Sequence, residues 1–153
     1  MLLVGWAGTV TDTPLDPSPL STQQLLDLTF EATDRPEFAD LLVELCDAGL
    51  MVMLVVNHLV EGQEMLAARY LDRGMASALV NSAMVGLELP DPEFFELCLD
   101  VADCGPEDVL YLDHDQGNLE VAAALGIQTI ALDLADPDSV AESADLIRQR
   151  MLT

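Results

Sequence analysis

Lysine is absent from this chain of 153 residues, and its five basic side chains are all arginines. Against them stand 28 acidic residues, which give a formal net charge of -23 at pH 7. So negative a surface repels the phosphates of nucleic acids and anionic membranes, and we expect neither as a partner. Two explanations of the charge stay open. One is solubility, or an acid-rich and lysine-poor proteome; the other is an acidic face that docks on a basic partner or mimics nucleic acid.

Long hydrophobic runs and a basic leader are also missing. No apolar stretch approaches the roughly 18–20 residues that cross a bilayer, and no basic segment precedes the first apolar run. Cysteines are few: Cys46, Cys98 and Cys104 are odd in number and lack the spacing of metal ligands. Cys46 and Cys98 fall on apolar helix faces, where a thiol acts as a small hydrophobe. We therefore expect a cytoplasmic protein with reduced cysteines.

Hydrophobic residues, by contrast, make up 51% of the chain, enough for a sizeable core in one domain. Apolar, strand-like stretches at 2–4, 50–56, 77–80, 109–113 and 127–132 alternate with stretches of helical periodicity. The helices are expected at 22–30, 36–48, 61–71, 93–103, 118–125 and 136–150, and residues 81–92 are expected to be a loop. This alternation predicts an α/β fold with a Rossmann-like, doubly wound parallel sheet.

The first strand leads into residues 5–9 (GWAGT). In an open α/β sheet, the loop at the carboxyl end of a central strand is where ligands bind. Here that loop carries no acid, base or metal ligand before Asp12. The sequence thus predicts a cleft at the position of a binding site, with few side chains that could take part in a reaction.

Four segments resemble motifs of the haloacid dehalogenase superfamily, in the same order along the chain. Gly8-Thr9 with Asp12-Thr13 is similar to the GT and DT of DxDGTxxDT, and residues 86–95 (GLELPDPEFF) are similar to GxxKPDPxxF. Residues 109–118 (VLYLDHDQGN) resemble hhhhDDxxxN, and residues 120–126 (EVAAALG) resemble its continuation xxAAxxxG. The resemblance implies a five-stranded sheet in the order 5-4-1-2-3, with the site between strands 1 and 4. It also implies one domain over residues 1–153, in which residues 13–35 form a short insert in place of the cap domain of many relatives.

The resemblance also shows which chemistry is missing. The superfamily's reaction uses an aspartate nucleophile, a second acid two residues later, a lysine, and a Ser or Thr that binds phosphate. On this chain those positions are Gly5, Ala7, Leu89 and either Val56 or Asn57. The first three cannot attack, transfer a proton or neutralise a phosphate, and such groups act as a unit. Asn57 keeps a side chain that can donate a hydrogen bond.

The last motif is kept in part. Asp113 matches a carboxylate that supports Mg²⁺, His114 replaces the second acid, and Asp115 follows. Without an acid at position 5, Asp113 and Asp115 would have to hold Mg²⁺ alone, although this ion prefers near-octahedral oxygen ligands. We therefore expect no cofactor and at most a weak Mg²⁺ site at these two residues. The alternative is a solvated strand end that caps the next helix.

The residues expected at the crevice share a place at or near the end of a predicted strand. They are Trp6, Thr9, Asn57, His58, Asp113, His114, Asp115 and Asn118. Trp6 either packs in the core or contacts a ligand. His58 is expected at the crevice rim, as a base without an obvious nucleophile, and His114 is either a surface histidine or part of the site.

Three hypotheses about function follow. The first is a non-catalytic protein that acts by binding a protein partner, a second copy of itself, or a small ligand in the emptied crevice. The second is a Mg²⁺-dependent hydrolase or phosphatase with an altered site that uses Asp113, Asp115, His114 and His58. The third is an acidic regulator of a basic partner.

Overall fold

The computed structural model describes residues 1–12 and 20–153. Its centre is a parallel sheet in the order β3-β2-β1-β4-β5, which is the predicted order counted from the opposite edge. The strands are β1 (Leu2–Gly5), β2 (Val52–Val56), β3 (Ala78–Asn81), β4 (Leu110–Asp113) and β5 (Gln128–Ala131). The predicted strands are thus confirmed to within about two residues, and β1 lies at the centre of the sheet.

Helices connect the strands. They are α1 (Thr22–Glu31), α2 (Pro36–Asp47), α3 (Gln63–Leu66), α4 (Ser82–Val85), α5 (Pro92–Ala102), α6 (Gln116–Ala124) and α7 (Ser139–Met151). Short helical turns are η1 (Trp6–Val10), η2 (Val60–Gly62), η3 (Ala67–Leu71) and η4 (Pro106–Asp108). Among the described residues, no helix is long and apolar enough to cross a membrane.

Side-chain caps explain where several of these helices begin and end. The hydroxyl of Ser21 accepts from the backbone of Gln24, whose side chain in turn accepts from the backbone of Ser21, so that α1 starts with a capping box. The prediction of an unbroken loop over residues 81–92 is wrong, because α4 lies within it. The side chain of Asn81 caps α4, and Gly86, with a φ of 71°, ends it.

The predicted insert at residues 13–35 is described only in part. Residues 13–19 lie outside the described residues, and the remainder contains α1 and the start of the approach to α2.

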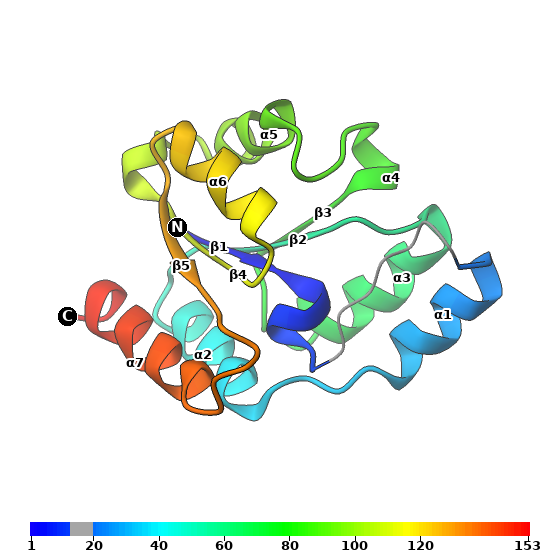
Figure 1. Ribbon diagram of the computed structural model, residues 1–153, viewed down its shortest axis with the longest axis horizontal. Coiled ribbons are helices and arrows are strands. Elements are labelled where there is room, and N and C mark those ends of the chain that lie inside the picture. Colours follow the sequence, from blue (N-terminus) through cyan, green and yellow to red (C-terminus); the bar gives the residue numbers. More distant parts are fainter. Residues whose placement is uncertain (13–19) are drawn as a thin grey trace.

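Helices cover both faces of the sheet, with α5 and α6 on one side and α2 and α7 on the other (Figure 1). Alternate side chains of β1 divide between the two cores. Leu2 and Val4 pack with α2, η3 and α7, whereas Leu3 packs with α5 and α6. All three are fully buried, as expected for a central strand of a parallel sheet. The same alternation places Tyr111 and Asp113 of β4 on the face covered by α5 and α6.

The cysteines lie where their helical positions predict. Cys98 is fully buried within α5, and Cys46 is half-buried on α2. Burial raises the pKa of the Cys98 thiol to about 12, which keeps it protonated and unreactive.

Candidate functional site

The carboxyl ends of β1, β2 and β4 surround a cleft of about 320 Å³, at the predicted place. Its apolar wall consists of Val55, Val56, Leu89 and Pro90. The rest of its lining is Gly5, Trp6, Ala7, Asn57, Asp113, His114, Asp115 and Asn118. Among the described residues no arginine lines it, so the cleft presents two carboxylates and no permanent cation.

Gly5 ends β1 directly against the carboxylate of Asp113. A Cβ atom at position 5 would lie 2.6 Å from Oδ2 and 2.8 Å from Cγ of Asp113, closer than real Cβ contacts come. Asp113 itself is only 3% exposed. Its carboxylate therefore occupies the space that a side chain at position 5 would need.

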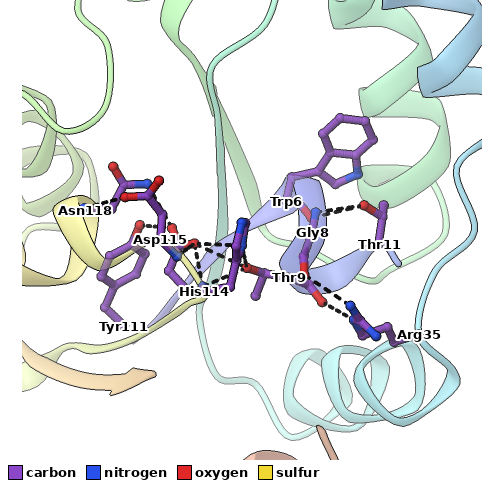
Figure 2. Close-up of polar contacts among 10 residues, drawn as sticks. Trp6, Gly8, Thr9, Thr11, Arg35, Tyr111, His114, Asp115 and Asn118 are labelled. Atoms are coloured by element: carbon purple, nitrogen blue, oxygen red, sulfur yellow. Dashed lines mark hydrogen bonds and ion pairs between the residues drawn. The ribbon is translucent and has the colours of Figure 1, made fainter. Parts of the chain in front are cut away.

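Asp113 is held there by a dense set of donors. Its Oδ1 accepts from the backbone N–H groups of His114 (2.7 Å) and Asp115 (3.1 Å) and from the hydroxyl of Thr9 (3.2 Å). Its Oδ2 accepts from the hydroxyl of Tyr111 and from Nδ2 of Asn118 (3.1 Å). Burial alone would raise the pKa of Asp113, but hydrogen bonds from His114, Tyr111, Asp115 and Asn118 outweigh it and hold that pKa below its usual value. Figure 2 shows Tyr111 and Asn118 on one side of the cluster and Thr9 on the other.

The residues present do not fit Mg²⁺. Both oxygens of Asp113 already accept hydrogen bonds from protein groups, and positions 5 and 7 offer no oxygen from a side chain. Asp115 is exposed, and its Oδ1 caps α6 by accepting from the N–H of Asn118 at 3.0 Å. Among the described residues, no cluster of three His, Cys, Asp or Glu could hold a metal. The expected cap is present at Asp115, whereas the picture of Asp113 as a solvated residue is wrong because it is buried.

Thr9 and His114 belong to the same cluster. Oγ1 of Thr9 lies 3.0 Å from Nδ1 of His114, and that nitrogen lies 3.4 Å from Oδ1 of Asp113. The side chain of His114 is 22% exposed and lines the cleft, but Thr9 is completely buried. The Thr9 hydroxyl is therefore a structural link and is out of reach of a substrate.

The turn after β1 is held by hydrogen bonds from Arg35. Gly8 has a φ of 73°, in the left-handed region that favours glycine. Arg35 donates from Nε to the carbonyl of Thr9 (3.1 Å) and from Nη2 to that of Gly8 (3.3 Å) (Figure 2). The Arg35 guanidinium is thus used on the backbone of this turn.

Asn57 lines the cleft as predicted, but its amide also contacts the protein. Its Nδ2 donates to the carbonyl of Leu89 at 2.9 Å, and its Oδ1 accepts from the N–H of Leu89 at 2.8 Å. This reciprocal pair joins the end of β2 to the segment in which a lysine was expected. One N–H and the oxygen of the amide are therefore used on the backbone of Leu89.

His58 is not at the crevice rim, and that prediction is wrong. It is 4% exposed, beneath α1, with Nε2 at 2.7 Å from Oγ1 of Thr29. Its Nδ1 accepts from the backbone N–H of Leu59 at 2.8 Å, so the proton of the neutral ring is on Nε2 and faces Thr29. The Thr29 hydroxyl in turn donates a hydrogen bond to the carbonyl of Leu25 at 2.7 Å. Nδ1 of His58 can accept from Leu59 only while the ring is neutral, so protonation of His58 would break this hydrogen bond.

Trp6 contributes to the cleft lining but keeps its indole in the core, which is the first of the two alternatives. It is 2% exposed, its Nε1 donates to the hydroxyl of Tyr70 at 2.6 Å, and its ring meets that of His58 edge-on. In Figure 2 the indole points away from the cluster of Tyr111 and Asn118.

Sequence reasoning missed Tyr111, whose hydroxyl is a partner of Asp113. A signal for it exists, because residues two apart on a strand face the same side. It also missed the contacts of Asp34, whose carboxylate accepts from Tyr70 (2.6 Å) and Arg69 (3.0 Å) across more than thirty residues of chain. No local pattern identifies such a pairing.

The contacts of His58 predict how stability depends on pH. Burial lowers the pKa of His58 below the ordinary 6.5, while the nearby carboxylate of Glu61 acts in the opposite direction. Below pH 6.5 the unfolded chain therefore binds a proton that the folded protein resists, and stability falls as the pH drops from 6.5 towards the lowered pKa. We expect a lower free energy of unfolding in urea at about pH 5.5 than at about pH 7.5, and a smaller difference in His58→Gln. An unchanged pH dependence in His58→Gln would contradict this account.

No family model matches the chain. An 87-residue stretch is 39% identical to mouse acyl-CoA dehydrogenase family member 10, and it covers 56% of this chain but 8% of that protein. The chain thus matches a small part of this curated relative.

Solved structures match over almost the whole length. A HAD-superfamily hydrolase from Ehrlichia chaffeensis superposes with a TM-score of 0.74 at 12% identity, covering 99% of this chain and 97% of that one. A HAD family enzyme from Bacteroides thetaiotaomicron gives 0.71 at 15% identity, covering 92% and 97%. An uncharacterized protein from Corynebacterium glutamicum gives 0.65 at 20% identity, covering 95% and 92%. With its strand order and its cleft at the end of β1, the chain has the haloacid dehalogenase-like fold.

Proposed function

We propose that this protein is a non-catalytic member of the haloacid dehalogenase-like fold and that it acts by binding. The observation that carries the proposal is the contact between Gly5 and Asp113. The space that a nucleophile at position 5 would need is filled by a carboxylate that five protein donors hold in place.

The cleft's charge supports the same conclusion. Leu89 stands where the motif has its lysine and lies in the apolar part of the cleft, and Asp113 and Asp115 line the same cleft. An anionic phosphate placed between them would meet carboxylates with no permanent cation, which is unfavourable in a partly desolvated cleft. The Bacteroides thetaiotaomicron enzyme, by contrast, has been solved with magnesium and inorganic phosphate bound.

A hydrolase with an altered site is the second candidate, and one observation favours it. His114 lines the cleft with Nδ1 oriented towards Asp113, an arrangement that fixes a histidine ring for proton transfer. The nucleophile is the weak point, because the hydroxyl closest to this ring belongs to the completely buried Thr9. The third candidate, an acidic regulator, would form a complex with a basic protein that dissociates at high salt.

Binding of Mg²⁺ together with orthophosphate separates the first two candidates. A protein that binds either ligand only when folded is stabilised in proportion to the logarithm of ligand concentration. We expect that adding Mg²⁺ and phosphate together leaves the melting temperature of the wild type unchanged, and likewise that of Asp115→Asn. A saturable rise in the wild type that Asp115→Asn abolishes would support the hydrolase.

A further inference from the structure

A second hollow lies away from the cleft, between the end of α1 and η3. Its volume is about 580 Å³, and the residues that matter here are Phe30, Glu31, Met65, Ala68, Arg69 and Arg73. We call these six residues the α1–η3 patch. The site proposed above uses none of them.

Phe30 gives the patch an exposed aromatic side chain. The chain has four phenylalanines, and this one is 77% exposed on the last turn of α1. Met65 is half-buried beside it and Ala68 is exposed. Large apolar side chains that gather around a hollow are typical of contact surfaces.

Arg69 joins the two sides of the patch. Its guanidinium donates to the carbonyls of Thr29 (3.1 Å) and Ala32 (2.5 Å), and it pairs with Asp34 at 3.0 Å. These contacts tie the end of α1 to η3. The backbone at the end of α1 is thus already held in place and need not be ordered when a partner binds.

The charges of the patch complement one another. Glu31 and Arg73 both line the hollow and are exposed, and neither forms an ion pair within residues 1–12 and 20–153. An exposed aromatic ring, an acid and a base therefore line the same hollow, with the acid and the base available to a partner. The patch thus carries a base, an acid, an apolar side chain and a hollow. When two copies pair about a two-fold axis, the base of each copy can meet the acid of the other, and the apolar side chain of each can enter the hollow of the other.

We propose that the α1–η3 patch is an interface between two copies of this chain. Phe30 of each copy packs over Met65 and Ala68 of the other, and Arg73 of each copy pairs with the partner copy's Glu31. This names a second copy as a partner and rests on the proposed function only in assigning the protein a role in binding. A failure of the dimer would leave the absence of turnover untouched, so the two proposals fail separately.

The test is a charge exchange, measured by sedimentation equilibrium at an ionic strength of about 0.15 M, where salt screens the overall repulsion. Placing like charges opposite each other at an interface is costly, so Arg73→Glu and Glu31→Arg should each weaken dimerisation about tenfold or more. The double variant, which keeps the net charge of the wild type, should restore it. Phe30→Ser should weaken it as well, and Val101→Ser on α5, with a wild-type side chain 53% exposed, is the matched control that should not.

The two single variants also separate pairing from overall charge. Arg73→Glu makes the chain more negative and Glu31→Arg makes it less negative, so a general charge effect would move the dimerisation constant in opposite directions. The proposal is overturned by a monomer at every concentration, by opposite shifts of the single variants, or by a double variant that does not recover.

Discussion

Replacing Gly5 with aspartate is expected to lower the free energy of unfolding by about 4 kcal/mol or more, and to create no enzyme. The new Cβ would meet Oδ2 of Asp113 at 2.6 Å, and the new carboxylate would be buried beside an existing one. Asp113 could make room only by breaking hydrogen bonds from its five donors, and a buried donor that loses its acceptor destabilises the folded state. Urea unfolding, followed by circular dichroism, measures the change.

A second glycine provides the matched control. A Cβ at Gly105 would lie equally close, 2.6 Å, to Oε1 of Glu107, but Glu107 is exposed and its side chain is free to move. Gly105→Ala should therefore change stability by about 1 kcal/mol or less, whereas Gly5→Ala should already be strongly destabilising. Equal effects of the two alanine substitutions would show that Asp113 moves aside easily, and would remove the main support for a filled site.

Replacing Asp113 with leucine is expected to destabilise the protein by about 3–5 kcal/mol. The substitution takes the acceptor away from the hydroxyl of Tyr111, Nδ2 of Asn118 and the N–H of Asp115, whereas the Thr9 hydroxyl and the N–H of His114 keep their contact with each other. Asp115→Ala is the control, because it removes only a helix cap and should cost about 1 kcal/mol. Urea unfolding at neutral pH compares the two; a change in Asp113→Leu no larger than in Asp115→Ala would mean that the cluster is not a structural centre.

The Asp113 carboxylate also makes the stability of the folded protein depend on pH in the acid range. The pKa of Asp113 is lowered in the folded protein, so its contribution to stability is present above the ordinary carboxyl pKa of 3.8 and is lost as the pH falls through the lowered value. This window lies below that of His58, which begins at pH 6.5.

The sheet could be predicted because its strands are continuous apolar runs, and such runs at 50–56 and 109–113 belong to buried parallel strands. The strand order came from the resemblance, since alternation alone fixes no order. Helix α4 was missed because its four residues carry little periodicity, and a cap from Asn81 fixes it.

The site was harder to predict than the fold. Gly5, Ala7 and Leu89 could be identified as positions that lack chemistry, because the motif spacing locates them. His58 looked like a residue at the rim because it follows an apolar strand, but packing of Thr29 from α1, far away in sequence, buries it. Asp113 looked like a metal ligand, and its role depends on the empty space at Gly5, which is a contact between β1 and β4 that no local pattern reveals.

The central claim, that the fold is kept without its chemistry, is tested most directly by turnover of a generic aryl phosphate at high protein concentration, with and without Mg²⁺. The matched variant is Asp115→Asn, which leaves the buried cluster around Asp113 in place. We predict no release of product above that variant and no dependence on Mg²⁺. Saturable, Mg²⁺-dependent turnover that Asp115→Asn abolishes would contradict the account, and would mean that a nucleophile acts in this cleft without a side chain at position 5.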